Sequence, residues 1–158
     1  MNTREAIKLN MDMANDICMG YLSDLSDQEM MKRPCQGCNH LNWQVGHLVA
    51  SEHGMMSKQF PMPPLPAGFA EKYEKETATV DNPEKFCTKA ELLEAAKAQR
   101  TGTLAALDKV SDADLDKPSG LDFAPTIGAL LSIQGSHWMM HAGQWAIVRR
   151  QLGRKPMF

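Results

Sequence analysis

The sequence has no run of apolar residues approaching the roughly 18 that a membrane-spanning helix needs. It has no excess of positive charge either, because 17 lysines and arginines stand against 19 aspartates and glutamates and form no basic stripe. The first residues, Met1 to Lys8, are polar and already helical in pattern, unlike an export signal. We therefore expect a cytoplasmic protein with no nucleic-acid or membrane partner, whose partner is a small molecule or another protein.

Cysteine is scarce and irregularly spaced, at Cys18, Cys35, Cys38 and Cys87. Without an export signal, this spacing favours reduced thiols over a disulfide framework. The stretch Cys35-Gln-Gly-Cys38-Asn-His40 resembles half of a zinc site, but no second closely spaced pair of cysteines or histidines exists outside residues 137–141. A redox dithiol is the other alternative, although the βαβ pattern that accompanies such motifs is absent. The favoured interpretation is a structural loop.

Strand patterns are also scarce, and apolar residues instead recur at steps of three and four. This periodicity predicts four amphipathic helices: residues 3–22, a second from Asn39 or Asn42 as its cap to about Gln59, a third opened by a capping box at Thr88 to Glu91, and a fourth from about Ile127 to Leu152 with Thr126 as its cap. Ser26 to Glu29 is a second capping box and predicts one or two helical turns. The 158 residues are expected to form a single domain, 1–158.

The connection from Phe60 to Cys87 is long and contains Pro61, Pro63, Pro64 and Pro66. A connection of this length tends to be functional or to wrap the fold, so we expect it to fold over one end, anchored by Phe69, Tyr73 and Phe86. Its length also permits the third helix to run parallel to the second. The predicted fold is therefore all-α, an antiparallel-type four-helix bundle with a long crossover between helices two and three.

His137 and His141 stand four residues apart on an apolar helix, so both imidazoles project from one face about one turn apart. Two imidazoles leave a divalent ion half coordinated, and His47, at an inward or semi-inward position of the second helix, is the best third ligand. Three neutral imidazoles and an open fourth position suit zinc best, with nickel, manganese or iron as alternatives. The alternative is a chance spacing of ordinary core histidines.

Other polar residues on apolar stripes also need an interpretation. Glu52 on the second helix and Gln144, one turn beyond His141, are candidates to assist catalysis from outside the ligand shell. Arg100 lies on the apolar face of the third helix, where we expect its stem to pack and its guanidinium to reach water. Gly128, Gly135 and Gly143 recur along one side of the last helix and predict a close approach by another helix.

The chain resembles the DinB-like family of helical bundles, which includes YfiT-type proteins, mycothiol-dependent maleylpyruvate isomerases and bacillithiol transferases. The resemblance rests on Asn42-Trp43 to His47-Leu48 and on His137-x-x-x-His141-x-Gly143-Gln144 leading to Arg149-Arg150-x-x-Gly153. It implies an up-down-down-up bundle, commonly a homodimer, with a divalent metal held by the equivalents of His47, His137 and His141. Relatives with known activity use the metal to activate a low-molecular-weight thiol.

Two functions follow from these residues. One is a metal-dependent enzyme, a thiol S-transferase or a hydrolase, in which the metal lowers the pKa of a bound thiol or water. The other is a non-catalytic bundle, stabilised by its metal, that serves in binding or in a stress response. The sequence offers no other clear acid, base or nucleophile, and family membership supports the metal more strongly than any substrate.

Overall fold

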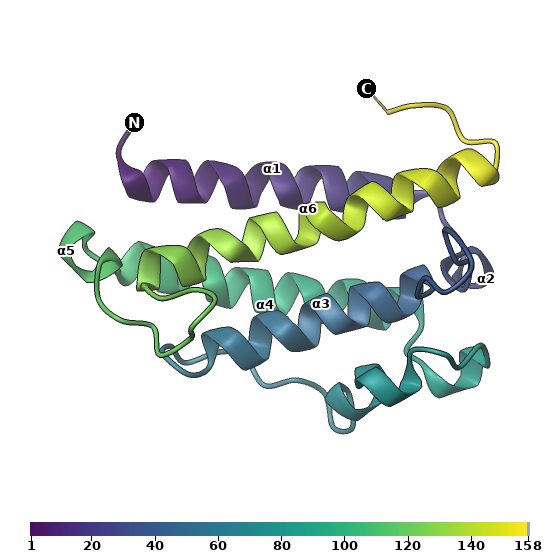
Figure 1. Cartoon of the computed structure of the whole chain (residues 1–158), viewed down its shortest axis with the longest axis horizontal. Helices are drawn as coiled ribbons and strands as arrows, with labels where there is room; N and C mark the ends of the chain where they lie inside the picture. The colour runs from purple at the N-terminus through teal and green to yellow at the C-terminus, as the bar shows by residue number, and fades with distance from the viewer. Residues whose placement is uncertain (158) are drawn as a thin grey trace.

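In the computed structural model, which describes residues 1–157, four long helices lie side by side (Figure 1). They are α1 (Thr3–Ser23), α3 (Leu41–Met56), α4 (Lys89–Lys109) and α6 (Ile127–Gln151). Helices α1 and α6 run in one direction and α3 and α4 in the other (Figure 1). No strand occurs among the described residues, so the prediction of an all-α fold is confirmed. The short elements are α2 (Asp27–Met30), η1 (Ala70–Tyr73), η2 (Lys75–Thr77), η3 (Pro83–Lys85) and α5 (Asp112–Leu115).

The helices begin where side chains satisfy the first free backbone amides. Both predicted capping boxes are present, with Ser26 and Glu29 opening α2 and Thr88 and Glu91 opening α4. The prediction that Asn39 or Asn42 caps α3 was wrong. The N-cap is His40, whose Nδ1 accepts a hydrogen bond from the Trp43 amide at 3.0 Å. An imidazole nitrogen with a free lone pair replaces the usual side-chain oxygen at this position.

The core lies between the four long helices, and α1 packs most extensively against α6. Apolar side chains of α1 at steps of three and four are buried, from Ile7 through Met11, Ala14 and Cys18 to Leu22. Gly135 permits the close approach of α1, because a Cβ there would lie 2.5 Å from Asn10 Nδ2, whereas a Cβ at Gly143 would meet no neighbour. Within residues 1–157 no helix is long and apolar enough to cross a membrane.

The connection between α3 and α4 is held against the bundle by its aromatic residues. Phe69, Tyr73 and Phe86 are buried, as predicted for its anchors. The Tyr73 ring packs against α3 at Gly46, where a Cβ would lie 2.2 Å from a ring carbon. The Tyr73 hydroxyl donates to Asn42 Oδ1 at 3.2 Å and accepts from the Cys87 amide at 3.0 Å. The connection is therefore fixed to α3 one turn before the helix reaches His47.

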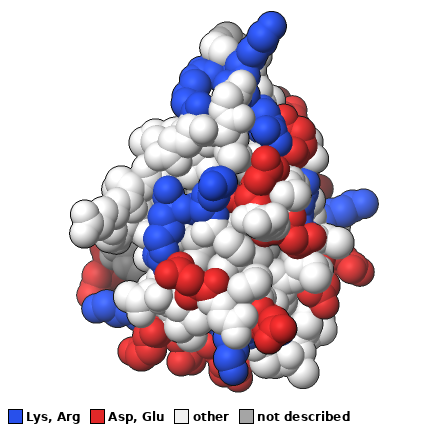
Figure 2. Space-filling view, turned by 90° about the vertical axis from the view of Figure 1, so that its right-hand side faces the viewer, with Lys and Arg blue, Asp and Glu red and all other residues white. Residues whose placement is uncertain are grey.

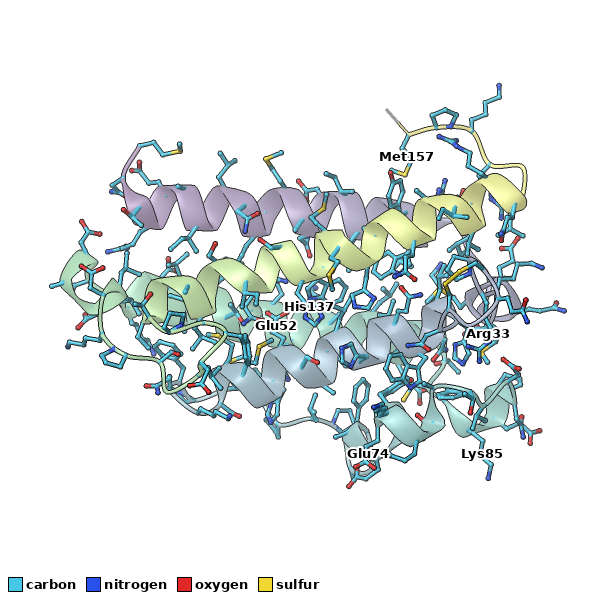
Figure 3. The ribbon with its side chains drawn as sticks, in the orientation of Figure 1. Arg33, Glu52, Glu74, Lys85, His137 and Met157 are labelled. Atoms are coloured by element: carbon cyan, nitrogen blue, oxygen red, sulfur yellow. A yellow bond between two sulfur atoms is a disulfide. The ribbon has the colours of Figure 1, made fainter. Side chains whose placement is uncertain are left out.

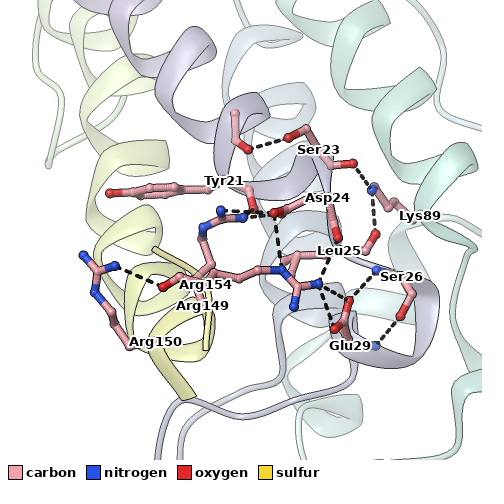
Figure 4. Close-up of polar contacts among 11 residues, drawn as sticks. Tyr21, Ser23, Asp24, Leu25, Ser26, Glu29, Lys89, Arg149, Arg150 and Arg154 are labelled. Carbon is pink, nitrogen blue, oxygen red and sulfur yellow. Dashed lines mark hydrogen bonds and ion pairs between the residues drawn. The ribbon is translucent and has the colours of Figure 1, made fainter. Parts of the chain in front are cut away.

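Charged residues gather at the end of the molecule where α1 leads into α2 and α6 ends (Figure 4). Arg149 of α6 donates to Asp24 and to the Tyr21 carbonyl, and Arg154 pairs with Glu29 at 2.9 Å. The face of the molecule at this end carries both signs of charge interspersed (Figure 2). These contacts tie the last turn of α6 to the α1–α2 corner.

Candidate metal centre

Three histidines from two helices converge between α3 and α6. His47 comes from α3, and His137 and His141 come from successive turns of α6. The label of His137 in Figure 3 marks the cluster. One ring nitrogen from each lies within 4.8 Å of the others. The ring centroids are 5.5 Å apart for His47 and His137, 5.8 Å for His47 and His141, and 5.2 Å for the pair on α6.

The surroundings of the cluster favour neutral imidazoles. Burial lowers the pKa of His47. The pKa of His137 is lowered by burial and by the nearby His47, and that of His141 falls to about 4 through burial and the neighbouring His137 and His47. Neutral imidazoles carry the lone pairs that bind metal. The Trp43 indole is stacked on His47, with ring centroids 5.0 Å apart and planes inclined by 6°, and so restricts rotation of that ring.

Gln44 fixes the tautomer of His141. Its Nε2 donates to the Asn39 carbonyl at 2.7 Å, and its Oε1 accepts from the indole N–H of Trp145 at 3.0 Å. Because a carbonyl only accepts and an indole only donates, these two partners set the orientation of the amide. The same Oε1 lies 3.0 Å from His141 Nδ1, which must therefore carry the proton. The lone pair of His141 is left on Nε2.

Gln44 was missed by the sequence analysis, which named Gln144 as the amide that assists the site. Gln144 Oε1 accepts a hydrogen bond from Gln44 Nε2 at 3.1 Å, so it contacts the residue that holds His141. The amide of Gln44 thus uses both donors and both lone pairs. Gln44 stands between the apolar residues Trp43 and Val45 and is 1% exposed. A buried amide requires hydrogen-bond partners, so an amide in an apolar stretch was the available indication of its role.

Glu52, the other predicted assisting residue, lies deep between α3, α4 and α6. Its Oε2 accepts from Arg100 at 3.1 Å and from Trp138 Nε1 at 3.1 Å, and its Oε1 accepts from Thr103 at 2.7 Å. Burial raises the pKa of Glu52, and Arg100 opposes this by stabilising the carboxylate. None of these bonds joins Glu52 to a histidine of the cluster.

The expectation that the Arg100 guanidinium reaches water was wrong. The residue is 8% exposed and pairs with Glu52, and its Nη2 also donates to the Gln134 carbonyl at 3.0 Å. Its guanidinium lies 6.0 Å from the centre of the Trp138 ring. The partner carboxylate stands on a different helix, which explains why periodicity within α4 suggested a solvated cation.

The histidine cluster fits a divalent metal by its donors. Tetrahedral zinc binds imidazole nitrogens at about 2.1 Å, so three such nitrogens stand roughly 3.4 Å apart. The three donors are already within 4.8 Å of one another. All three rings favour the neutral state, and the hydrogen bond to Gln44 turns the lone-pair nitrogen of His141 away from the amide. Small rotations of these side chains would bring the nitrogens to one ion.

A cavity of about 590 Å³ opens beside the cluster. His47 and His137 line it, together with other residues of α3 and α6, Lys58 just after α3, and Leu121 and Phe123 of the loop before α6. A small molecule in this cavity would lie against two of the three histidines. The size and the apolar lining are typical of a ligand site.

The cysteine motif departs from the prediction of reduced thiols, because Cys35 and Cys38 are joined by a disulfide. The turn brings their Cα atoms within 5.3 Å, with a hydrogen bond from the Cys38 amide to the Cys35 carbonyl at 3.1 Å and Gly37 at φ 79°. Arg33 also donates to the Cys38 carbonyl at 2.6 Å and so holds this turn. Cys18 and Cys87 are free and buried.

Comparisons with known proteins agree with this architecture. A solved structure described as a conserved protein of a locus from Enterococcus faecalis matches with a TM-score of 0.63 over 98% of this chain and 99% of that chain, at 15% sequence identity. This similarity extends to the fold alone. No curated protein matches the sequence. The family model of the DinB superfamily, in which metal binding is common, matches residues 12–145. The chain therefore belongs to the DinB superfamily.

Proposed function

We propose that this protein is a divalent-metal-dependent enzyme that activates a low-molecular-weight thiol, as an S-transferase, or water, as a hydrolase. The observation that carries the proposal is the convergence of His47, His137 and His141 beside a cavity large enough for a substrate. Zinc fits the nitrogen donors best, with nickel, manganese and iron as alternatives. When bound, such an ion supplies Lewis acidity, which lowers the pKa of a thiol or water at the open position.

The protein's own residues would hold and shape the site. Gln44 keeps the proton of His141 on Nδ1, and Trp43 keeps the His47 ring in its plane. Gln144 supports Gln44, and Glu52 joins Arg100 of α4 to Trp138, the neighbour of His137. In this proposal Gln144 and Glu52 assist by positioning the helices and do not touch the substrate.

The proposal includes the finer topology predicted from the sequence. The four long helices would form an up-down-down-up bundle whose α3–α4 connection is the long crossover. The parallel directions of α3 and α4 in Figure 1 and the buried aromatic anchors of the connection support it. This topology would bring α3 and α6 together from opposite directions and so place His47 opposite the pair on α6.

A second candidate function, a non-catalytic metal-stabilised bundle, is supported by one observation. Both oxygens of Glu52 are engaged, and no aspartate or glutamate lies among the described residues that line the cavity. The general acid or base of an enzyme would then have to come from the ligands or the substrate. In this case metal would raise thermal stability without supporting any turnover.

Metal analysis of protein purified without chelator or affinity resin, followed by conjugation assays with a panel of bacterial thiols, tests the proposal. We expect stoichiometric metal, and we expect His47→Ala, His137→Ala and His141→Ala each to lose it while remaining folded by circular dichroism. His53→Ala is the matched control, because His53 also lies on α3 but bonds to Gln99 at 3.1 Å. A triad variant that keeps stoichiometric metal would remove that residue from the site. Metal-dependent stability with no thiol conjugation or hydrolysis would favour the second function.

A further inference from the structure

The cavity beside the histidines, called the groove below, is bounded by α3, α6 and the loop before α6. On α3 it is lined by His47, Ser51 and Gly54, which recur at helical spacing along one side, and Lys58 follows in the turn after the helix. Gly54 lies seven residues after His47, about 10 Å along the helix axis, and Lys58 comes four residues later, beyond the helix end. The groove therefore has two chemically different ends, one with metal-binding nitrogens and one with an ammonium group.

Between these ends the lining is mainly apolar. Met55, Ile133 and Met140 contribute aliphatic or thioether surface, and Leu121 and Phe123 close the groove from the loop before α6. Phe123 is 63% exposed and Met140 is 64% exposed, which is high for side chains of this size. Large apolar side chains exposed around one cavity are typical of a binding site for apolar ligands.

Gly54 keeps the middle of the groove open. Glycine weakens a helix relative to alanine, and it is usually explained by a left-handed backbone or by a close neighbour. Neither reason applies at Gly54, because its φ is not positive and a Cβ there would meet no atom within 4 Å. By contrast, Gly46 on the same helix is packed against Tyr73. A side chain at position 54 would occupy only the space of the groove.

Lys58 is the one lysine, arginine, aspartate or glutamate among the described residues that line the groove. Within the described part of the chain, Lys58 forms no salt bridge with an acidic side chain. An unpaired ammonium at the end of an apolar groove complements a ligand that has an apolar body and an anionic group.

We propose that this groove binds an elongated apolar molecule bearing a carboxylate or sulfonate, with its anionic end at Lys58 and its other end at the histidines. This inference names the substrate class of the proposed function. Only the statement that the bound molecule is the substrate rests on that function. Binding itself depends on Gly54, Lys58 and the apolar lining, and it does not require the metal.

Fluorescence titration with 8-anilinonaphthalene-1-sulfonate, and its displacement by decanoate, tests the proposal. We expect wild-type protein to bind the dye saturably and decanoate to displace it. Gly54→Leu fills the groove and should weaken both interactions at least about tenfold, as expected when an apolar pocket is lost. Ser57→Leu is the matched control, because it adds the same side chain at an exposed neighbouring position that does not line the groove. Equal dye binding by wild type and Gly54→Leu would overturn the site.

The charge of the ligand is tested with Lys58→Glu and the conservative Lys58→Arg. Measured directly by calorimetry, because the dye is itself an anion, Lys58→Glu should weaken binding of decanoate about fivefold and should leave or improve binding of decyltrimethylammonium, while Lys58→Arg behaves as wild type. If Lys58→Glu changed neither, or changed both equally, the anionic class would be wrong.

The metal-free variant His141→Ala separates this inference from the proposed function, because His141 does not line the groove. Its dissociation constants for dye and decanoate should lie within about twofold of those of wild type, which is a negligible difference in binding free energy. Loss of dye binding in this variant, with its fold intact, would show that the groove does not bind ligand independently of the metal. Absence of metal from wild-type protein would contradict the proposed function and leave the dye result to decide the groove.

Discussion

Gln44 Oε1 accepts a hydrogen bond from His141 Nδ1 at 3.0 Å, and this contact between α3 and α6 determines which nitrogen of His141 is free. Replacing Gln44 with alanine should lower metal affinity by about 10- to 100-fold, as is usual when the partner of a ligating histidine is lost. It should also destabilise the fold by about 1–3 kcal/mol, because the buried Trp145 N–H loses its acceptor. Competition with a chromophoric chelator measures the first effect and urea unfolding the second.

Gln144→Ala is the comparison for this prediction, since among the described residues Gln144 bonds to Gln44 and not to His141. Its effect on metal affinity should be clearly smaller. If Gln144→Ala weakened binding as much as Gln44→Ala, the orienting role would belong to both amides together.

The ion pair of Glu52 with Arg100 should be a major element of stability. Glu52→Ala leaves a buried guanidinium without its carboxylate, for which we expect a loss of about 3–5 kcal/mol. Nη1 of Arg100 already has no hydrogen-bond partner among the described residues, so the variant has little alternative bonding. Asp12→Ala, which breaks the exposed pair with Lys8, is the control and should cost less than about 1 kcal/mol. Chemical denaturation measures both variants.

Glu52→Gln separates stability from chemistry, because the amide retains an acceptor for Trp138 or Thr103. We expect it to keep its metal. If it remained as stable as wild type but lost metal-dependent turnover, Glu52 would take part in the reaction directly, and its assignment to positioning would be wrong.

Cys35 and Cys38 should be oxidised in the folded protein. Alkylation in denaturant without a reductant should therefore modify two of the four cysteines, Cys18 and Cys87, and all four after reduction, as measured by mass spectrometry. Closing so short a loop stabilises the fold by about 2 kcal/mol at most, so the Cys35→Ser/Cys38→Ser protein should remain folded. Four alkylated cysteines without reductant would support the reduced thiols expected from the sequence.

Stability should fall as the pH is lowered, in part because of His40. Burial and then Arg33 lower the pKa of His40 to about 4 from 6.5. The unfolded chain therefore takes up a proton before the folded one, so this contribution is fully present above pH 6.5 and is lost as the pH falls toward 4. The total is about 3 kcal/mol, since the pKa falls from 6.5 to about 4.

His40→Asn isolates this contribution, because asparagine retains a cap acceptor for the Trp43 amide. The free energy of unfolding of wild-type protein should depend more steeply on pH between 6.5 and 4 than that of the variant. The two proteins are compared in the same metal-free state, since the three clustered histidines titrate in the same direction. Equal slopes would show that His40 is protonated in the folded protein.

The parts of this protein that the sequence predicts are those governed by local periodicity and local capping. The His137–His141 spacing lies within one helix, and the boxes at Ser26 and Thr88 involve residues three apart, so each is visible in a short window. The all-helical fold and the buried anchors of the connection follow from the same patterns. The approach of His47 required an additional assumption about which faces of the two helices meet.

What the sequence did not predict depends on partners from distant segments. Gln44 bonds to residues about 100 positions away, and Arg100 finds its carboxylate 48 residues earlier. His40 caps α3 although histidine is not a usual cap residue, because its other nitrogen bonds the Val80 carbonyl at 3.1 Å. In each case a polar side chain in an apolar stretch indicated that a partner exists without identifying it.

The contact between Tyr73 and Gly46 has a consequence for how this chain can change. A single methyl group at position 46 would collide with the phenol ring and displace the residue that ties the connection to both Asn42 and Cys87. The connection between α3 and α4 can therefore keep its position only while residue 46 of α3 has no Cβ atom. Because His47 is the next residue of α3, a substitution that moves the connection at Gly46 would also move a histidine of the metal centre.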